Sequence, residues 1–369
     1  MVNALKKIDK KILIIAGIIL FLPILIIIFL AIIQGCSNSS NTPEKYEEKM
    51  ISAAEKYFDE KGLPEEEAEV KTVKLNTLVK NGYIKSTEKL LKDNSCKGSV
   101  TVRRNGSNIK ETEEGFYNYI VNLECDDYTT NTLKKELMED LTTSGNGLYE
   151  LNGHYVFKGD VVNNYITFFG DNYRILNMDS NGLVKLLKVD YELLDRVWDN
   201  KYNIEVDSLS GINNYSESGI IKSLKEDYFN EKIFSDSSRK HLVAKDVCVD
   251  PTLYSEGNLK NYNCTNKIEK QILSLVDIDD YALASLDVNC NNLYAKSCVN
   301  YNYLTDVRIM SWTMNPLADN SYEVYFMSNG NPKRQNASEY NYYHLVIHVD
   351  GNEKILSGIG SKEDPYVIK

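Results

Sequence analysis

The sequence lacks the residue patterns that zinc sites and hydrolase active sites usually require. It contains no Cys-x-x-Cys pair, and none of its four histidines stands at metal-ligand spacing from a cysteine. No metal site and no cofactor are therefore expected. Serine, histidine and aspartate residues are present, but no nucleophile-elbow motif positions them as a catalytic triad.

The chain also lacks an excess of basic residues. It carries 42 Lys and Arg against 53 Asp and Glu, which gives a formal net charge of -11. Beyond Cys36 the balance is 38 basic to 52 acidic residues, a net charge of -14. Because nucleic acids bind through their phosphates, this acidic surface excludes them as partners, and tight contact with anionic lipid is not expected.

No charged residue occurs between Ile12 and Ile33, a run of 22 residues that are nearly all Ile, Leu, Phe or Ala. As a helix this run spans about 33 Å, which predicts a transmembrane helix over 12–33 with a mild kink at Pro23. Four lysines precede the run, and no charge follows it before Glu44. The positive-inside rule then predicts a single-pass protein of the cell membrane, with a cytoplasmic N-terminus and extracellular C-terminal domains.

The end of this run has a second interpretation. Ile33-Gln34-Gly35-Cys36 resembles a bacterial lipobox, so the run is alternatively a cleaved signal and Cys36 a lipidation site. The run is longer than the apolar region of most signal peptides, and Gln34 is unusual at its lipobox position. A retained helix is favoured, and both interpretations place the domains outside.

The other six cysteines favour disulfides, because an even number in an exported chain is typical of a disulfide framework. Many pairings are open, and proximity in the sequence favours three: Cys96–Cys125, Cys248–Cys264 and Cys290–Cys298. The first has further support from strand alternation. If residues 96 and 125 face each other in a hairpin, the apolar rows of both strands fall on one side.

The apolar pattern predicts an α+β fold class. We expect a helix from Glu44 to Phe58, a hairpin over 96–125, a three-stranded meander over 165–189 and a helix capped by Ser216. The predicted organisation begins with a cytoplasmic tail (1–11), a transmembrane helix (12–33) and a tether (34–42). A small α+β domain with a disulfide-linked hairpin (43–130), a linker (131–150) and a larger mixed domain (151–369) follow.

Several segments within residues 165–369 resemble a known family: NNYITFFGDNYRILNMDSNGLVKLL, YSESGIIKSLKEDYFN, ILSLVDIDDYALAS, SWTMNP and GIGSKEDPYVI. In this order they are similar to the formylglycine-generating-enzyme-like domains, which are sulfatase-modifying-factor-like and C-type-lectin-like. The resemblance implies a lectin-like fold and a tendency to bind ligands. Family enzymes use a close pair of copper-binding cysteines, whereas Cys290 and Cys298 lie eight apart without matching flanks, so the catalytic role does not transfer. Residues 43–130 resemble small exported modules of AT-rich Gram-positive bacteria.

Tyrosine is abundant, with 26 residues, many of them mixed with Asn and Ser. This mixture is typical of adaptable binding surfaces, and equally of an AT-rich genome. Trp198 and Trp312 are more typical of a core than of a site. The candidate ligand-binding residues are Tyr301, Tyr303, Trp312, Tyr340, Tyr342 and Tyr343.

Two further groups are candidate metal sites. His344 and His348 lie four apart on a predicted strand, about 13 Å, which is too far for one ion. His154 and His241 are likewise interpreted as ordinary solvent or core residues. The acidic cluster of Asp277, Asp279 and Asp280 suits either calcium or the N-terminus of a helix, but lacks the glycine-spaced pattern of a calcium loop.

The leading hypothesis is a non-enzymatic, membrane-anchored binding protein at the surface of a Gram-positive-type bacterium. Its expected partner outside the membrane is a glycan, a peptide or a protein, recognised through the lectin-like domain. The alternatives are an oxidase of the formylglycine-generating type and a structural subunit of a cell-surface assembly.

Overall fold

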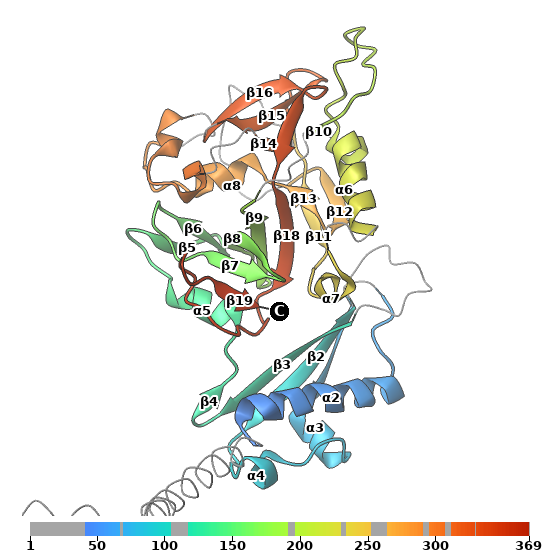
Figure 1. Cartoon of the computed structure of the whole chain (residues 1–369), viewed down its shortest axis with the longest axis vertical. Helices are drawn as coiled ribbons and strands as arrows, with labels where there is room; N and C mark the ends of the chain where they lie inside the picture. The colour runs from blue at the N-terminus through green and yellow to red at the C-terminus, as the bar shows by residue number, and fades with distance from the viewer. Residues whose placement is uncertain are drawn as a thin grey trace, which may run out of the picture. The chain divides into compact units, whose positions relative to one another are not determined.

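A computed structural model describes most of the chain beyond residue 40 (Figure 1). The described residues are 41–66, 69–104, 117–190, 196–229, 234–251, 264–290, 295–306, 311–328 and 330–368. The predicted transmembrane helix over 12–33 and the candidate lipidation site Cys36 lie outside them. Among the helices that are described, none is long and apolar enough to cross a membrane.

Contacts divide the chain into two compact units. Unit 1 comprises Met1–Glu60, Val73–Val100 and Val121–Thr129, and unit 2 comprises Lys61–Thr72, Thr101–Ile120 and Thr130–Lys369. Residues 131–150, the expected linker, belong to unit 2 and include α5 (Leu133–Glu139) and most of β5 (Gly147–Leu151).

The expected α+β fold class is wrong. The described chain is mostly β-sheet with few helices. The prediction missed strands whose side chains do not alternate, such as β16 (Asn331–Asn336), a polar strand with the sequence NPKRQN. Its six residues pair in register with β15 (Glu323–Ser328). Backbone pairing of this kind leaves little trace in side-chain pattern.

Unit 1 contains a four-stranded sheet in the order β1-β2-β3-β4. Its helix α2 (Pro43–Lys61) confirms the predicted helix and buries one apolar face through Tyr46, Met50, Ala53, Ala54 and Phe58. The other elements are β1 (Val70–Lys74), α3 (Leu75–Lys80), α4 (Thr87–Leu90), β2 (Lys97–Arg104), β3 (Tyr117–Cys125) and β4 (Tyr128–Thr129); parts of β1, β2 and β3 belong to unit 2.

A close approach of helix and sheet helps to define the interior of unit 1. A Cβ atom added to Gly98 on β2 would lie 3.1 Å from the terminal methyl group of Met50 and 2.6 Å from the carbonyl oxygen of Asn122. Glycine at position 98 therefore lets α2 and β3 pack closely against β2. The predicted Cys96–Cys125 disulfide is confirmed and joins the paired ends of β2 and β3.

Unit 2 contains an eight-stranded sheet whose main path is β13-β18-β9-β8-β6-β5. Its meander of β7 (Tyr165–Phe168), β8 (Asp171–Met178) and β9 (Leu183–Lys188) confirms the prediction for residues 165–189. The remaining strands are β6 (His154–Lys158), β13 (Ser274–Leu275), β18 (Leu345–Asp350) and β19 (Tyr366–Ile368), which pairs in parallel with β7.

A second sheet and a hairpin complete the strands of unit 2. The five-stranded sheet has the order β10-β17-β14-β15-β16, with β10 (Arg196–Val197), β17 (Tyr340–Tyr343) and β14 (Ser311–Pro316). The hairpin consists of β11 (Lys245–Cys248) and β12 (Lys267–Gln271). The α-helices besides α5 are α6 (Gly219–Phe229), α7 (Asp236–Arg239) and α8 (Ile278–Leu283); short 3-10 turns cover Tyr215–Glu217, Lys296–Val299 and Tyr303–Asp306.

The start of α6 differs from the prediction. The hydroxyl of Ser218, rather than that of Ser216, accepts a hydrogen bond from the Ile221 amide at 3.4 Å. The 3-10 turn over Tyr215–Glu217 precedes the helix and moves its start past Ser216. Both tryptophans are fully buried, as expected: the Trp198 indole donates to the Thr313 carbonyl, and the Trp312 indole donates to the Arg196 carbonyl.

Candidate ligand-binding site

A row of polar residues runs across three neighbouring strands of the eight-stranded sheet of unit 2. Lys185 on β9 is the register partner of His348 on β18 and of Asn177 on β8. Register partners in adjacent strands project on the same face of a sheet, so these three side chains are neighbours. The strands β8, β9 and β18 run side by side in Figure 1. Apart from this row, β9 and β18 contribute apolar residues to the core, including Val184, Leu186, Val346, Ile347 and Val349.

The short helix α8 supplies a carboxylate that pairs with Lys185. The ammonium of Lys185 lies 2.5 Å from Oδ2 of Asp280, and both side chains are largely buried, at 12% and 6% exposure. The amide nitrogen of Asn177 also donates to Oδ1 of Asp280, at 3.3 Å. Burial raises the pKa of Asp280, and the adjacent ammonium of Lys185 offsets part of that rise.

The acidic cluster at the start of α8 has the helix-terminus role that was one of its two interpretations. Asp277 is the N-cap, and its side chain together with that of Asp280 forms a reciprocal capping box. Oδ1 of Asp277 also accepts a hydrogen bond from the side-chain amide of Asn315 at 3.0 Å. Asp279 lies in the first turn and is 8% exposed. These bonds explain the cluster without a bound cation.

A second ion pair ties the β11–β12 hairpin to the turn after β8. The ammonium of Lys245 lies 2.5 Å from Oδ2 of Asp179, with side-chain exposures of 28% and 5%. Oδ1 of Asp179 accepts the backbone amides of Asn181 and Leu183, each at 2.9 Å. Because every oxygen of Asp179 has a partner, this carboxylate is firmly positioned and holds Lys245 in turn.

These groups surround one cavity of about 300 Å³, which we call the polar pocket. Its lining includes Lys185, Lys245, Asp179, Asp280, His154 and His348. The hairpin and the disulfide that joins its ends contribute Asp246, Lys267, Cys248 and Cys264. Leu283 and Met314 supply apolar surface. The volume lies at the small end of the roughly 300–1,000 Å³ typical of ligand pockets.

The polar pocket keeps its histidines neutral near pH 7. Burial lowers the pKa of His348 well below its usual value, and the ammonium groups of Lys245 and Lys185 lower that pKa further. Burial also lowers the pKa of His154, as does Lys245, while Asp179 opposes that change. A neutral imidazole offers one donor and one acceptor, so His348 adds hydrogen-bonding capacity to the pocket without adding charge.

The other two histidines occupy separate environments, so the four do not form one site. Nδ1 of His241 lies 2.9 Å from Oε1 of Glu353, and both residues are buried. Nδ1 of His344 lies 3.0 Å from the carbonyl oxygen of Lys188.

The six aromatic candidates are not brought together on one surface. Tyr303, Trp312 and Tyr343 are buried, with at most 3% exposure, and the ring of Tyr303 lies 4.7 Å from the guanidinium of Arg174. Tyr301 and Tyr340 are exposed, at 60% and 66%, while Tyr342 is half-buried. Trp312 and Tyr343 are register partners of β14 and β17, and so are the neighbouring Ser311 and Tyr342.

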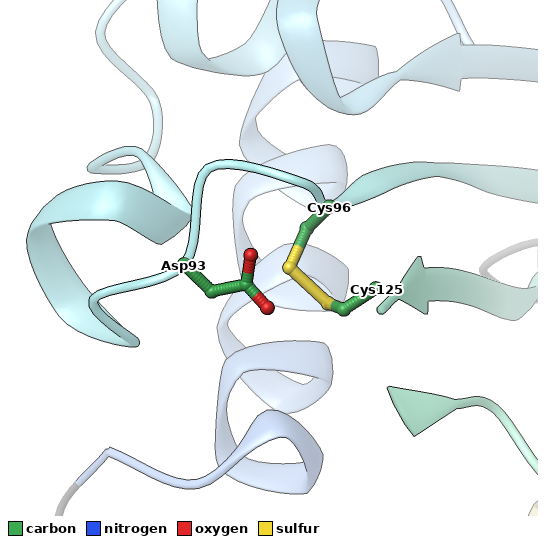
Figure 2. Close-up of side chains that lie close together, drawn as sticks. All are labelled: Asp93, Cys96 and Cys125. Atoms are coloured by element: carbon green, nitrogen blue, oxygen red, sulfur yellow. A yellow bond between two sulfur atoms is a disulfide. The ribbon is translucent and has the colours of Figure 1, made fainter. Parts of the chain in front are cut away.

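All three predicted disulfides are confirmed: Cys96–Cys125, Cys248–Cys264 and Cys290–Cys298. Two of them lie within ligand distance of a carboxylate, and Figure 2 shows one, Asp93 beside Cys96 and Cys125. Oδ1 of Asp93 accepts the amide and the hydroxyl of Ser95, which lowers the pKa of Asp93. The other carboxylate, Asp250 beside Cys248 and Cys264, accepts the amides of Thr265 and Asn266. Sulfur in a disulfide is not a thiolate, so neither cluster is a metal site in this oxidised form.

Sequence reasoning missed the polar pocket. Lys185 and His348 each interrupt an apolar strand, in LVKLLK and LVIHVD, and a charged or titratable residue in such a strand was the available signal.

No family model, no curated protein and no solved structure matches this chain. The resemblance to formylglycine-generating-enzyme-like domains therefore stays a prediction from the sequence.

Proposed function

We propose that this chain is an extracellular, non-enzymatic binding protein whose polar pocket takes a small polar ligand. One observation carries the proposal: two buried or half-buried Lys–Asp pairs and a neutral histidine converge on a single cavity. Buried ion pairs seldom add net stability, because removing charges from water costs about as much as their attraction returns. Their position around a cavity therefore favours a role in recognition.

Binding is favoured over the oxidase alternative by the state of the candidate cysteines. Cys290 and Cys298 are joined in a disulfide, and both are buried. Neither lines the polar pocket. A reaction at these residues would require reduced, accessible thiolates.

An extracellular location is supported by the three disulfides, because such bonds persist in oxidising compartments. Attachment to the cell membrane rests on residues 1–36, which lie outside the described part of the chain.

The test is a thermal-shift screen of the full-length protein against sugars, amino acids, dipeptides, organic acids and inorganic phosphate. A ligand at 100 times its dissociation constant stabilises the protein by about 2.7 kcal/mol, which is roughly 5–10 °C for a domain of this size. The double variant Lys185→Met/Asp280→Asn should lose the shift, whereas Lys362→Gln, an exposed change outside the pocket, should keep it. A shift of equal size in the double variant would contradict the proposal.

A further inference from the structure

A short loop of unit 2 exposes several apolar side chains close together. Four of the eight residues from Tyr202 to Leu209 are exposed apolar residues, between 41% for Val206 and 86% for Ile204. Single exposed apolar residues are ordinary on a protein surface, whereas a group of them marks an interaction site. We call residues 202–209 the apolar loop. It lies between β10 and α6, in the yellow-green segment that extends away from the sheets in Figure 1.

The apolar loop is held as a hairpin by Asn203. The backbones of Asn203 and Ser208 exchange two hydrogen bonds, of 2.8 and 3.2 Å. The side chain of Asn203 is buried, and its amide donates to the carbonyl oxygens of Gly211 and Ser321. Its side-chain oxygen accepts the backbone amide of Glu205 at 3.0 Å. Because the hairpin is already formed, a partner would bind it at a small cost in conformational entropy.

The pairing of the hairpin places two apolar residues side by side. Since Asn203 and Ser208 are antiparallel register partners, Tyr202 and Leu209 oppose each other at the adjacent positions. Side chains alternate between the two faces of a hairpin, and that of Asn203 is buried in unit 2. Tyr202 and Leu209 therefore project from the outer face. The other two apolar residues lie in the turn that joins the two sides.

The charged groups of the apolar loop are acidic. Glu205 and Asp207 are both exposed in the turn. The hydroxyl of Tyr202 donates to the carboxylate of Asp207, a hydrogen bond that leaves the negative charge in place. The nearest basic residue in the sequence, Lys201, lies beside the buried carboxylate of Asp199, at 3.2 Å. The exposed apolar side chains are therefore bordered by negative charge.

This charge distinguishes three kinds of partner. In a symmetric contact between two copies of the chain, the acidic groups of one loop would face those of the other, and like charges repel. The surface of an anionic membrane would repel the loop for the same reason. A protein whose apolar groove is bordered by Lys or Arg side chains complements both the apolar residues and the charge.

We propose that the apolar loop is a docking site for a protein partner with an apolar groove bordered by Lys or Arg side chains. Ile204 and Leu209, its two most exposed apolar residues, enter the groove. Glu205 and Asp207 face the basic border. The inference is independent of the polar pocket, because the described lining of that pocket includes no residue of the loop.

The experiment places a photo-reactive cross-linker in the loop of the full-length protein, in the cells that make it. Cells carrying Val206→benzoylphenylalanine are irradiated, and the adduct is identified by mass spectrometry. We expect one protein adduct, whose cross-linked peptide contains apolar residues flanked by Lys or Arg. Lys362→benzoylphenylalanine, at an exposed position outside the loop, should not form this adduct.

Titration of the purified partner against the full-length protein then measures the contribution of each feature. Ile204→Ser/Leu209→Ser should weaken binding at least tenfold, about 1.4 kcal/mol. Glu205→Gln/Asp207→Asn should weaken it by about threefold and reduce the dependence of the affinity on salt. Lys362→Gln is the control and should leave the affinity unchanged. All these side chains are exposed, so a melting temperature equal to that of the wild type shows that each variant is folded.

The outcomes distinguish a protein partner from the other two kinds. A cross-link to a second copy of this chain or to lipid would overturn the proposal, as would the absence of any adduct. A partner that binds the wild type and Ile204→Ser/Leu209→Ser equally tightly would also overturn it. An affinity that Glu205→Gln/Asp207→Asn leaves unchanged would overturn the basic border, and with it the stated chemistry of the partner.

Discussion

Unit 1 and the eight-stranded sheet of unit 2 fill their interiors differently. The interior of unit 1 is mostly apolar, with Met50, Phe58, Val100 and Leu123 all buried, and Glu47 is the buried charged residue of α2. The sheet of unit 2 has a comparable apolar core but is crossed by the polar row that ends at His348. Apolar burial stabilises by about 25 cal/mol per Å², whereas even a paired buried charge adds little net stability, because desolvation offsets the attraction of the pair. The apolar layer of unit 1 therefore stabilises its fold, whereas the polar row adds little stability for the charges that it buries, and the proposed ligand binding would account for its presence.

The largest expected effect concerns the disulfide of unit 1. Replacing Cys96 and Cys125 together by alanine opens a loop with a sequence separation of 29 residues. The chain-entropy model then predicts a loss of about 3–4 kcal/mol from the stability of unit 1. Hydrogen exchange is the measurement: amides of β2 and β3 should exchange faster, and those of β8 and β9 should not. Equal acceleration in both sheets would show that the two regions unfold as one.

The next effect concerns the polar row. Lys185→Met leaves the buried carboxylate of Asp280 without its cation and should lower the unfolding free energy by about 3 kcal/mol. Adding Asp280→Asn should recover most of the lost unfolding free energy, because the two substituted side chains are both neutral. The control is Lys188→Met on the same strand, whose partner Asp171 is 45% exposed, so its loss should stay below about 1 kcal/mol. Urea denaturation measures all four proteins, and failure of the second change to restore stability would argue against a charge effect.

A loss of stability caused by histidine protonation between pH 7 and pH 5 should be confined to unit 2, since all four histidines belong to it. The folded-state pKa of His348 is depressed by burial, so the folded protein prefers the neutral ring. Its contribution is complete above the unfolded pKa of about 6.5 and is lost as pH falls toward the depressed folded value, at up to about 1.4 kcal/mol per pH unit. The raised pKa of Asp280 acts in the opposite direction, since its contribution is lost as pH rises.

Comparison with His348→Gln isolates the histidine, because Asp280 is present in both proteins. Urea denaturation between pH 7 and pH 5 should show a steeper loss of stability in the wild type than in the variant. Parallel pH profiles would remove His348 as the cause.

The smallest expected loss of stability comes from removing a helix cap, and it should be similar in unit 1 and unit 2. Ser86 caps α4 in unit 1 through the Lys89 amide, and Ser218 caps α6 in unit 2 through the Ile221 amide. Either serine changed to alanine should cost about 1 kcal/mol in urea denaturation. Ser216→Ala is the control, and a cost equal to that of Ser218→Ala would contradict the observed start of α6.

The sequence alone was sufficient for features whose residues lie close together along the chain. The helix α2, the meander of β7 to β9 and the three disulfides were all predicted, because helix periodicity, turn residues and cysteine proximity are local signals. The predicted fold class failed because short or polar strands such as β16 are specified by backbone pairing with distant neighbours.

The polar pocket was decided only by tertiary structure. Its two ion pairs join Asp179 to Lys245 and Lys185 to Asp280, residues 66 and 95 positions apart. No periodicity relates residues at such separations, and the chain brings them together only when the hairpin and α8 pack beside the sheet. The sequence therefore determined which charges exist and which strands carry them, and folding determined which charges meet, because long-range contacts depend on the packing of whole elements.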